Sequence, residues 1–318
     1  MRALHVPTAG AQPQLGELPT PSASEGTVLV RVKAAGLNPV DNGIASGMMS
    51  QMIPHEYPLV LGRDAAGVVE AVGEGVEGIS QGDEVFGHVL LVPPIQAGTL
   101  AEYVVLPAAT VAPKPHGLDF VSAAAIPLAG ATAAQSIDAI DAQAGQTVLV
   151  NGAGGGVGSF ALQLLAARGV TVIATGTPDS AERLRELGAS TIIDRTAGPV
   201  VEQVRAAHPD GVDALINLSP GYNPQEVPIG AVRRGGKMAS ASAMPDEETL
   251  AAAGLTGSQV MGSAVREVTG PLAEQAAAGK LKVHVSSVVP LERAANALGT
   301  IAAGKANGKI VVDLGTQN

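Results

Sequence analysis

The chain has 318 residues, 46% of them hydrophobic, which suits about two globular domains with sizeable cores. Its formal net charge of −10 disfavours a nucleic-acid partner, because contacts with phosphates need a basic face. The sequence contains no cysteine, so disulfides, iron–sulfur clusters, thiolate zinc sites and cysteine nucleophiles are excluded.

The sequence also disfavours a membrane protein and a metal site carried by a single helix. No window approaches the roughly 20 uninterrupted apolar residues of a membrane-spanning helix, and the N-terminal MRALHVPTAGAQPQ lacks the apolar run of a signal peptide. We therefore expect a soluble cytoplasmic protein without a membrane partner. No two of the histidines stand three to five residues apart, so a helical H-E-x-x-H site is absent.

The first 120 residues predict short strands separated by Pro and Gly. In the first clear strand, Val28, Val30 and Val32 alternate with other residues at the period of a strand. The predicted strands are 27–36 (TVLVRVKAAG), 59–78, 82–92 and 101–107. Their spacing indicates an all-β, barrel-like module.

The pattern changes near residue 120. An alanine-rich helical segment, 120–140, is broken at Pro127, and strands then alternate with helices. Strands are predicted at 146–152, 170–176, 190–194, 212–218, 235–242 and 259–265, with helices at 156–169, 180–188 and 200–208. This alternation predicts a doubly wound parallel sheet. Beyond it we expect helices at 271–279 and 291–304 and strands at 282–290 and 309–314.

A glycine-rich loop, VLVNGAGGGVG (148–158), follows a predicted strand and opens a predicted helix, which is the context of a dinucleotide fingerprint. The usual G-x-G-x-x-G spacing is met only with Ala153 in the first position. Gly155 lets the backbone approach a pyrophosphate, Gly158 lets the helix pack closely, and the helix N-terminus favours negative charge. The candidate cofactor-binding residues are Gly152, Gly155, Gly156, Val157 and Gly158. The alternative is a turn that binds nothing.

The end of the second strand favours NADP(H) over NAD(H). An NAD enzyme usually places an acid there, but this strand ends at Thr175 and Gly176, and the first acid is Asp179 in the following loop. The hydroxyl of Ser180 and the guanidinium of Arg183 suit a 2′-phosphate. Thr175, Ser180 and Arg183 are therefore cofactor candidates. The alternative is a solvated Arg183 paired with a nearby acid.

Several segments resemble the zinc-independent branch of the medium-chain dehydrogenase/reductase superfamily, and most closely its quinone oxidoreductase family. They are AAGLNPVDNGIASG (34–47), LGRDAAGVVEAVGEGV (61–76), PLAGATAAQ, GGKMASAS, GKLKVHVSSVVPLERAANAL and GKANGKIVVDL. The resemblance implies an α/β chain in which a Rossmann NADP-binding domain, residues 121–265, is inserted in a GroES-like bent β-barrel catalytic domain, residues 1–120 and 266–318.

The resemblance also implies chemistry without a metal. Zinc-dependent relatives carry a cysteine where Leu37 or Asn38 stands and Gly-His-Glu where Gly62, Arg63 and Asp64 stand, and both ligand sets are absent here. What remains is hydride transfer from NADPH to a quinone or a polarised carbon–carbon double bond, with the substrate in the cleft between the domains.

The resemblance places Asn38 and Asp41 near the nicotinamide as catalytic candidates. Asn38 would hydrogen-bond a substrate carbonyl or the nicotinamide ribose, unless it only makes the turn that Asn-Pro favours. Asp41 would orient the loop. Thr132 would contact the nicotinamide, unless it is an ordinary helix threonine.

Further cofactor candidates follow from the later strands. Asn217 and Ser219 end one strand, and Ser240 follows Met238 in the next, beside the expected ribose. Lys309 is a weaker candidate, because a solvated lysine is the simpler expectation there.

The chain departs from the family just after residues 38–41, which we call the NPVD segment. Family members often carry Tyr or Trp-Lys there, whereas Asn42 and Gly43 stand here, so no tyrosine in this loop can donate a proton. Water would then protonate the product. The altered positions also suit an enlarged pocket with an adaptable apolar mouth, for which the candidates are Met48, Met49 and Met52.

Three functions remain open from the sequence. The first is an NADPH-dependent quinone reductase, and the second is an enoyl or alkenal double-bond reductase, with a biosynthetic role as one option. The third is an NADP(H)-binding protein with a structural or regulatory role. We also expect a homodimer formed along the apolar sheet edge near 259–265.

Overall fold

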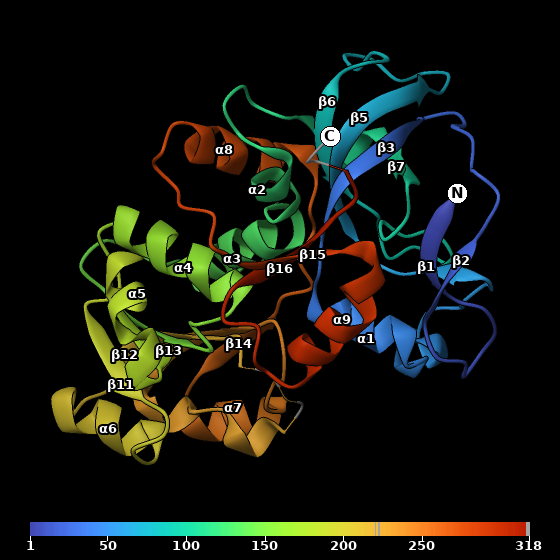
Figure 1. Ribbon diagram of the computed structural model, residues 1–318. Helices are drawn as coiled ribbons and strands as arrows, with labels where there is room; N and C mark the ends of the chain where they lie inside the picture. Colours follow the sequence, from blue (N-terminus) through green and yellow to red (C-terminus); the bar gives the residue numbers. More distant parts are fainter. Residues whose placement is uncertain (220, 222, 316–318) are drawn as a thin grey trace. The chain divides into compact units, whose positions relative to one another are not determined.

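The computed structural model describes residues 1–219, 221 and 223–315, and its elements are labelled in Figure 1. The chain divides into two compact units. Unit 1 comprises Met1–Leu128 and Ala264–Asn318, and unit 2 comprises Ala129–Ser263. The domain limits proposed from the sequence, 121 and 265, lie near the two points at which this division falls.

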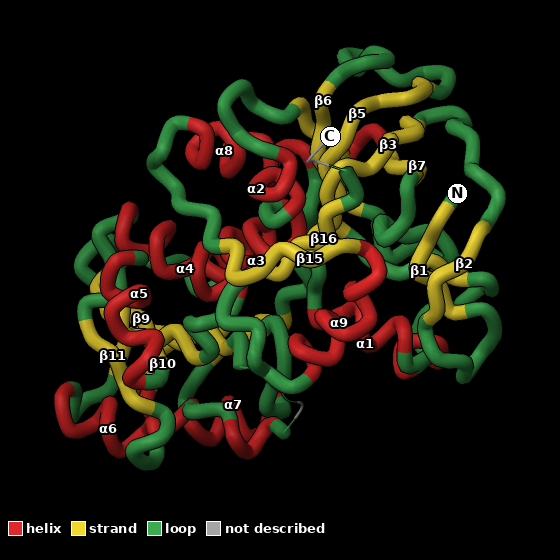
Figure 2. The backbone as a smooth tube through the Cα atoms, viewed as in Figure 1, coloured by secondary structure: helices red, strands yellow, loops and turns green. Residues whose placement is uncertain are grey.

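Unit 1 is built mainly on strands, coloured yellow in Figure 2, most of which pair antiparallel. In the described part of the chain they form a three-stranded sheet, β2-β1-β4, and a seven-stranded sheet, β15-β16-β3-β5-β6-β8, in which β7 also pairs with β3. The strands are β1 (Arg2–Val6), β2 (Gln14–Glu17), β3 (Thr27–Gly36), β4 (Leu59–Val60), β5 (Asp64–Val72), β6 (Glu84–His88), β7 (Tyr103–Pro107), β8 (Val111–Pro113), β15 (Val285–Pro290) and β16 (Lys309–Asp313). Only the β15–β16 pair among these is parallel.

The apolar face of β3 enters the core of unit 1. Val28, Val30 and Val32 are at most 2% exposed, as their alternation predicts. The helices of this unit are α1 (Pro39–Ala45), α2 (Phe120–Ala124), α8 (Arg266–Ala277) and α9 (Ala294–Ala302). The predicted strands of the first 120 residues are largely confirmed, but the module is not all-β, because α1 lies within it; both ends of the chain contribute strands to one sheet.

Unit 2 is a parallel sheet with intervening helices. Its strands are β9 (Thr147–Asn151), β10 (Thr171–Gly176), β11 (Thr191–Asp194), β12 (Val212–Asn217), β13 (Val232–Ser240) and β14 (Thr256–Gln259), and its helices include α4 (Gly156–Ala167), α5 (Ala181–Glu186), α6 (Val200–Ala207) and α7 (Glu247–Ala253). The strand order β11-β10-β9-β12-β13-β14 is the Rossmann order. The order reverses between β9 and β12, where such sheets bind dinucleotides. Helix α3 (Pro127–Ala139) begins at the end of one unit and continues into the other.

Some element predictions were wrong in detail. The sixth strand is Thr256–Gln259, not 259–265, and Gly262 with φ of 59° interrupts extended backbone in the predicted segment. The sequence patterns missed α7, which begins where the Asp246 side chain accepts a hydrogen bond from the Thr249 N–H at 2.8 Å. Helix α8 begins at Arg266 and includes Pro271, which we expected near its start.

Across the described residues, no helix combines the length and the apolar character needed to cross a bilayer.

Two glycines give opposite stability predictions. A Cβ added to Gly36 would collide with the backbone carbonyl of Ala124, so Gly36→Ala should lower the free energy of unfolding by about 1–3 kcal/mol. Gly299 lies in α9 with no atom within 4 Å of an added Cβ, so Gly299→Ala should raise it by about 0.5–1 kcal/mol. Urea unfolding of both variants measures the two changes, and equal shifts would contradict the packing of α2 on β3.

Candidate functional site

The glycine loop of unit 2 leaves β9 through a turn that only glycine allows. Gly152 has a φ of 83°, and a Cβ there would lie 2.5 Å from the carbonyl carbon of Leu218. A Cβ on Gly158 would collide with the Ala153 carbonyl, so this glycine permits the close contact between helix and turn. At Gly155 the nearest atom to an added Cβ is the Gly152 carbonyl oxygen at 3.6 Å, an ordinary van der Waals distance, so this position is less crowded than the other two.

Helix α4 begins directly after this loop, with Gly155 as its N-cap. The N–H groups of a first helical turn have no partners within the helix, and the helix dipole adds positive potential there. These features suit an anionic group such as a pyrophosphate. The expected cofactor-loop residues therefore stand together at one helix N-terminus.

A row of polar side chains links the ends of neighbouring strands. Thr175 Oγ1 accepts a hydrogen bond from the Gly152 N–H at 2.9 Å and donates to Asn151 Oδ1 at 3.0 Å. Asn151 Nδ2 donates to Asn217 Oδ1 at 2.9 Å. Asn217 Nδ2 then lies 3.2 Å from Ser240 Oγ. The row fixes the carboxyl ends of β10, β9, β12 and β13 relative to one another.

The row gives a structural role to three residues that the sequence named only as cofactor candidates. The side chains of Thr175, Asn217 and Ser240 use their hydrogen bonds within the protein, and the last two are at most 1% exposed. Sequence reasoning missed Asn151, which joins Thr175 to Asn217. Its position as the last residue of β9, at the predicted switch point, was the available signal.

Arg183 reaches from α5 to the glycine loop. Its Nη2 donates to the backbone oxygen of Gly154 at 3.3 Å. Its Nη1 is buried with no hydrogen-bond partner in the described chain, and burial lowers the pKa of the guanidinium. Ser180 Oγ instead bonds the backbone of Thr177, accepting from its N–H at 2.9 Å. Arg183 is thus the candidate with unused donor capacity beside the loop.

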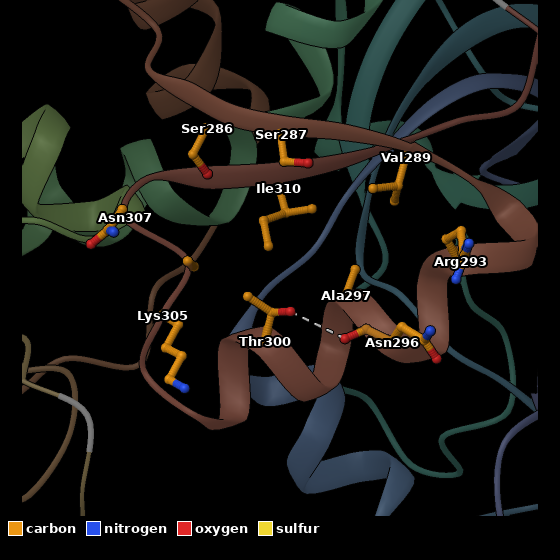
Figure 3. Close-up of a pocket in the computed structure, with 11 residues that line it drawn as sticks. Ser286, Ser287, Val289, Arg293, Asn296, Ala297, Thr300, Lys305, Asn307 and Ile310 are labelled. Atoms are coloured by element: carbon orange, nitrogen blue, oxygen red, sulfur yellow. Dashed lines mark hydrogen bonds between the residues drawn. The ribbon is translucent and has the colours of Figure 1, made fainter.

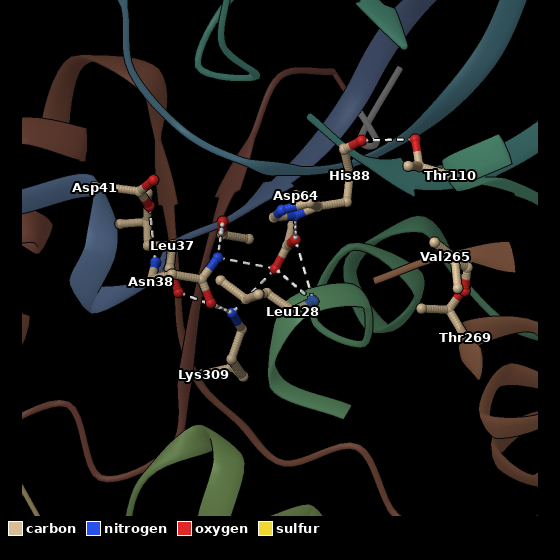
Figure 4. A network of polar contacts seen from close by, with 11 residues as sticks. Leu37, Asn38, Asp41, Asp64, His88, Thr110, Leu128, Val265, Thr269 and Lys309 are labelled. Carbon is tan, nitrogen blue, oxygen red and sulfur yellow. Dashed lines mark hydrogen bonds and ion pairs between the residues drawn. The ribbon is translucent and has the colours of Figure 1, made fainter. Parts of the chain in front are cut away.

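A second cluster of candidates lies in unit 1, around the fully buried carboxylate of Asp64 (Figure 4). Asp64 Oδ1 lies 2.7 Å from His88 Nδ1, on the paired strand β6, and its Oδ2 accepts from Asn38 Nδ2 at 2.8 Å. The Leu128 N–H at the start of α3 lies 3.2 Å from Oδ1. Burial alone would raise the pKa of Asp64, but the hydrogen bonds from His88 and Asn38 and the charge of Lys309 hold it below its usual range.

Lys309 is buried in the same cluster, at 4% exposure, so the expectation of a solvated lysine is wrong. Its Nζ donates to Leu37 O at 2.8 Å and to Asn38 Oδ1 at 2.7 Å, and it pairs with Asp64 Oδ2 at 3.5 Å. Burial lowers the pKa of this ammonium, and the two nearby carboxylates oppose that effect. The Asn38 amide is consequently held at both of its ends.

Asp41 shapes the loop that carries Asn38. Its Oδ2 accepts a hydrogen bond from the Asn38 N–H at 2.8 Å, which caps the first turn of α1. Its Oδ1 is buried without a partner in the part of the chain described. Burial raises the pKa of Asp41 to about 6, although the charge of Arg63 acts in the opposite direction.

The remaining candidates are more dispersed. Thr132 is buried in α3, in unit 2, and its carbonyl oxygen accepts from Ser136 Oγ at 2.7 Å. Met48 and Met52 are 63% and 76% exposed, whereas Met49 packs partly against the core of unit 1. The cofactor-loop candidates and the Asn38 cluster belong to different units of the chain.

The residues at the zinc-ligand positions do not fit a metal. The Arg63 guanidinium donates to the carbonyls of Val60 and Ala97, and the Lys309 ammonium stands between Asn38 and Asp64. A divalent cation there would face this ammonium, with an amide in place of a thiolate. The described residues contain no group of three or more His, Cys, Asp or Glu side chains that could hold a metal ion.

Two family models match the sequence. One is described as an alcohol dehydrogenase GroES-like domain and matches residues 24–116; the other is described as a zinc-binding dehydrogenase and matches residues 187–312. The NADPH-dependent alkenal/one oxidoreductase of Arabidopsis thaliana chloroplasts is 33% identical over 301 residues, which cover 92% of this chain and 73% of the relative.

Other curated relatives are matched over less of their length. The mitochondrial NAD(P)H oxidoreductase RTN4IP1 of Mus musculus is 37% identical over 196 residues, 56% of this chain and 49% of the relative. The chain thus spans about half the length of several curated relatives that it matches.

Solved structures match nearly the whole chain. The quinone oxidoreductase of Coxiella burnetii has a TM-score of 0.88 at 27% identity, with 99% of each chain covered. The Escherichia coli quinone oxidoreductase in complex with NADPH has a TM-score of 0.87 at 26% identity, covering 98% of this chain and 100% of that one. An NAD-dependent alcohol dehydrogenase has a TM-score of 0.87 at 34% identity, covering 99% and 100%.

Similarity of this extent, together with the Rossmann strand order and the antiparallel sheets of unit 1, identifies the family. The chain belongs to the medium-chain dehydrogenase/reductase superfamily, in its quinone oxidoreductase-like group.

Proposed function

We propose that this protein is an NADPH-dependent reductase that delivers hydride to a quinone without a metal. The observation that carries the proposal is the glycine loop at the N-terminus of α4, with the unpaired Nη1 of Arg183 beside it. Relatives and neighbours named as NAD(P)H, quinone and alkenal/one oxidoreductases support it.

The residues of unit 2 fit NADP(H). The pyrophosphate would lie against the first turn of α4, next to Gly155, and Arg183 would hold the 2′-phosphate. The row from Thr175 to Ser240 would fix the strand ends beneath the cofactor, and Thr132 would contribute from α3. When bound, NADPH supplies the hydride, and the protein supplies position and a dry environment.

The residues of unit 1 favour chemistry without a metal. The ammonium of Lys309 provides the positive charge in the Asn38 cluster, and Asp64 balances it. Because both ends of the Asn38 amide are engaged, we assign Asn38 to positioning the NPVD loop rather than to binding a substrate carbonyl. Asp41 supports that loop, and water supplies the proton after hydride transfer.

A second candidate is an alkenal or enoyl double-bond reductase. The similarity to the Arabidopsis alkenal/one oxidoreductase over 92% of this chain favours it. The two activities share the cofactor and differ only in the acceptor.

The third candidate function is a purely NADP(H)-binding regulatory role. The absence of tyrosine after the NPVD segment supports it.

We also propose an assembly and a location. The protein is a cytoplasmic homodimer whose contact runs along β14, an edge strand whose residues are all exposed in the single chain. Unpaired N–H and C=O groups on such an edge can pair with a second copy.

The acceptor can be identified by following NADPH oxidation at 340 nm against quinones, 2-alkenals and enoyl thioesters. Fastest turnover with quinones is expected, and the rate should not change after incubation with EDTA. Faster turnover with 2-alkenals would select the second candidate. NADPH binding without turnover on any acceptor would select the regulatory role, and absence of NADPH and NADH binding would refute all three.

Arg183→Ala should raise the Kd for NADPH about 10- to 100-fold, because a charge-assisted contact with the 2′-phosphate is lost. The Kd for NADH should change little. Arg185→Ala is the matched control, since Arg185 is an exposed arginine on the same helix. Isothermal titration with both cofactors measures the effect. Equal losses for NADPH and NADH would show that Arg183 does not recognise the 2′-phosphate.

The raised pKa of Asp41, about 6, predicts a pH-dependent stability. Between roughly pH 4 and 6 Asp41 holds a proton in the folded protein that it has released in the unfolded chain, so its contribution to the free energy of unfolding should fall as pH rises. The full effect is at most about 3 kcal/mol, from a shift of about two pKa units. Urea unfolding across this range should show that wild type loses stability relative to Asp41→Asn as pH rises, with the exposed Asp210→Asn as control. Identical slopes for wild type and Asp41→Asn would count against the raised pKa.

A further inference from the structure

A cavity of about 510 Å³ lies in unit 1 between β15, α9 and the segment that precedes β16 (Figure 3). We call it the β15–α9 pocket. It contains none of the candidate cofactor or catalytic residues. Ile310 lines it and Lys309 precedes Ile310 in β16, so their side chains project to opposite faces of that strand. The pocket is therefore separated from the Asp64 cluster by the strand itself.

The pocket is positively charged in a protein of net charge −10. The ionisable side chains that line it are Arg293 and Lys305, and no carboxylate lines it. Both cations are exposed at the mouth of the pocket, and neither has a hydrogen-bond or ion-pair partner for its side chain among the residues described. A pair of unpartnered cations facing one cavity favours an anion there, because the protein supplies no counter-charge of its own.

The space between these cations is apolar. Val289 and Ile310 project from β15 and β16, and Ala297 projects from α9, toward the same cavity (Figure 3). Arg293 and Lys305 lie at different ends of this apolar surface in the close-up. A simple inorganic ion would leave the apolar surface exposed to water, whereas a hydrocarbon body would cover it.

The walls of the pocket are held in place by backbone contacts. Ser286 Oγ donates to the backbone oxygen of Lys309 at 3.1 Å, which ties β15 to β16. His284 Nε2 lies 3.0 Å from the backbone oxygen of Asn307, and the Lys305 N–H bonds Thr300 O at 3.1 Å. The segment that carries Lys305 is thus anchored at both ends, so binding would not have to order it.

We propose that the β15–α9 pocket binds an amphipathic organic acid, a single carboxylate or sulfonate group on an apolar body. The anionic group pairs with Arg293 or Lys305, and the body covers Val289, Ala297 and Ile310. The site is separate from the hydride-transfer chemistry proposed above and does not depend on it.

The probe for the test is 8-anilinonaphthalene-1-sulfonate, whose fluorescence rises in apolar surroundings, titrated into the full chain with and without saturating NADPH. Probe bound at a nucleotide site would be displaced by NADPH, whereas binding in the β15–α9 pocket should persist. One saturable site that resists NADPH is expected, and decanoate should displace the probe from it. Absence of a saturable NADPH-resistant site would refute the proposal.

The double variant Arg293→Gln/Lys305→Gln should weaken that binding at least tenfold, because the charge-assisted contact with the anionic group is lost. Arg195→Gln/Lys280→Gln is the matched control, with the same loss of charge at exposed residues outside the pocket. Ser287→Phe should also weaken binding by filling the pocket without a change of charge. Equal affinities in the two double variants would place the probe elsewhere and overturn the proposal, and thermal unfolding confirms that each variant is folded.

Discussion

The buried carboxylate of Asp64 is the constraint on which unit 1 depends. A buried charge is stable only when it is paired and hydrogen-bonded, and Asp64 meets this requirement with groups from distant parts of the sequence. His88 binds it from β6, Asn38 from the NPVD loop, Lys309 from β16 and the Leu128 N–H from the start of α3. One carboxylate thus fixes elements from both ends of the chain.

The same arrangement bears on the metal-free chemistry proposed above. The positive charge in the cluster comes from Lys309 of β16, and the resemblance to zinc-dependent relatives expects a cysteine where Leu37 or Asn38 stands. Because this ammonium already bonds Asn38 and pairs with Asp64, the residues of the cluster need no bound ion to hold them together. Under the proposed function, position and the cofactor then set the chemistry.

The sequence predicted most of the fold and part of the site. Hydrophobic alternation and the glycine loop are local signals, and they located the Rossmann sheet and the glycine turn that opens α4. The burial of Lys309 was not predictable, because its partners Leu37 and Asn38 lie 272 and 271 residues away. The role of His88 depends on its register opposite Asp64 in the β5–β6 pair, and strand register is not visible in a single sequence. Strand β14 was misplaced because its residues, TGSQ, have little strand character and are ordered by backbone pairing with β13.

The row of hydrogen bonds from Thr175 through Asn151 and Asn217 to Ser240 has a consequence for engineering. Its members are uncharged, and they bond one another and nearby backbone atoms, so in the proposed complex they offer no group that distinguishes NADPH from NADH. The proposed function leaves that discrimination to Arg183, on the separate helix α5. Under that proposal, cofactor preference in this scaffold is modular: it can be redesigned in the α5 segment while the sheet stays unaltered.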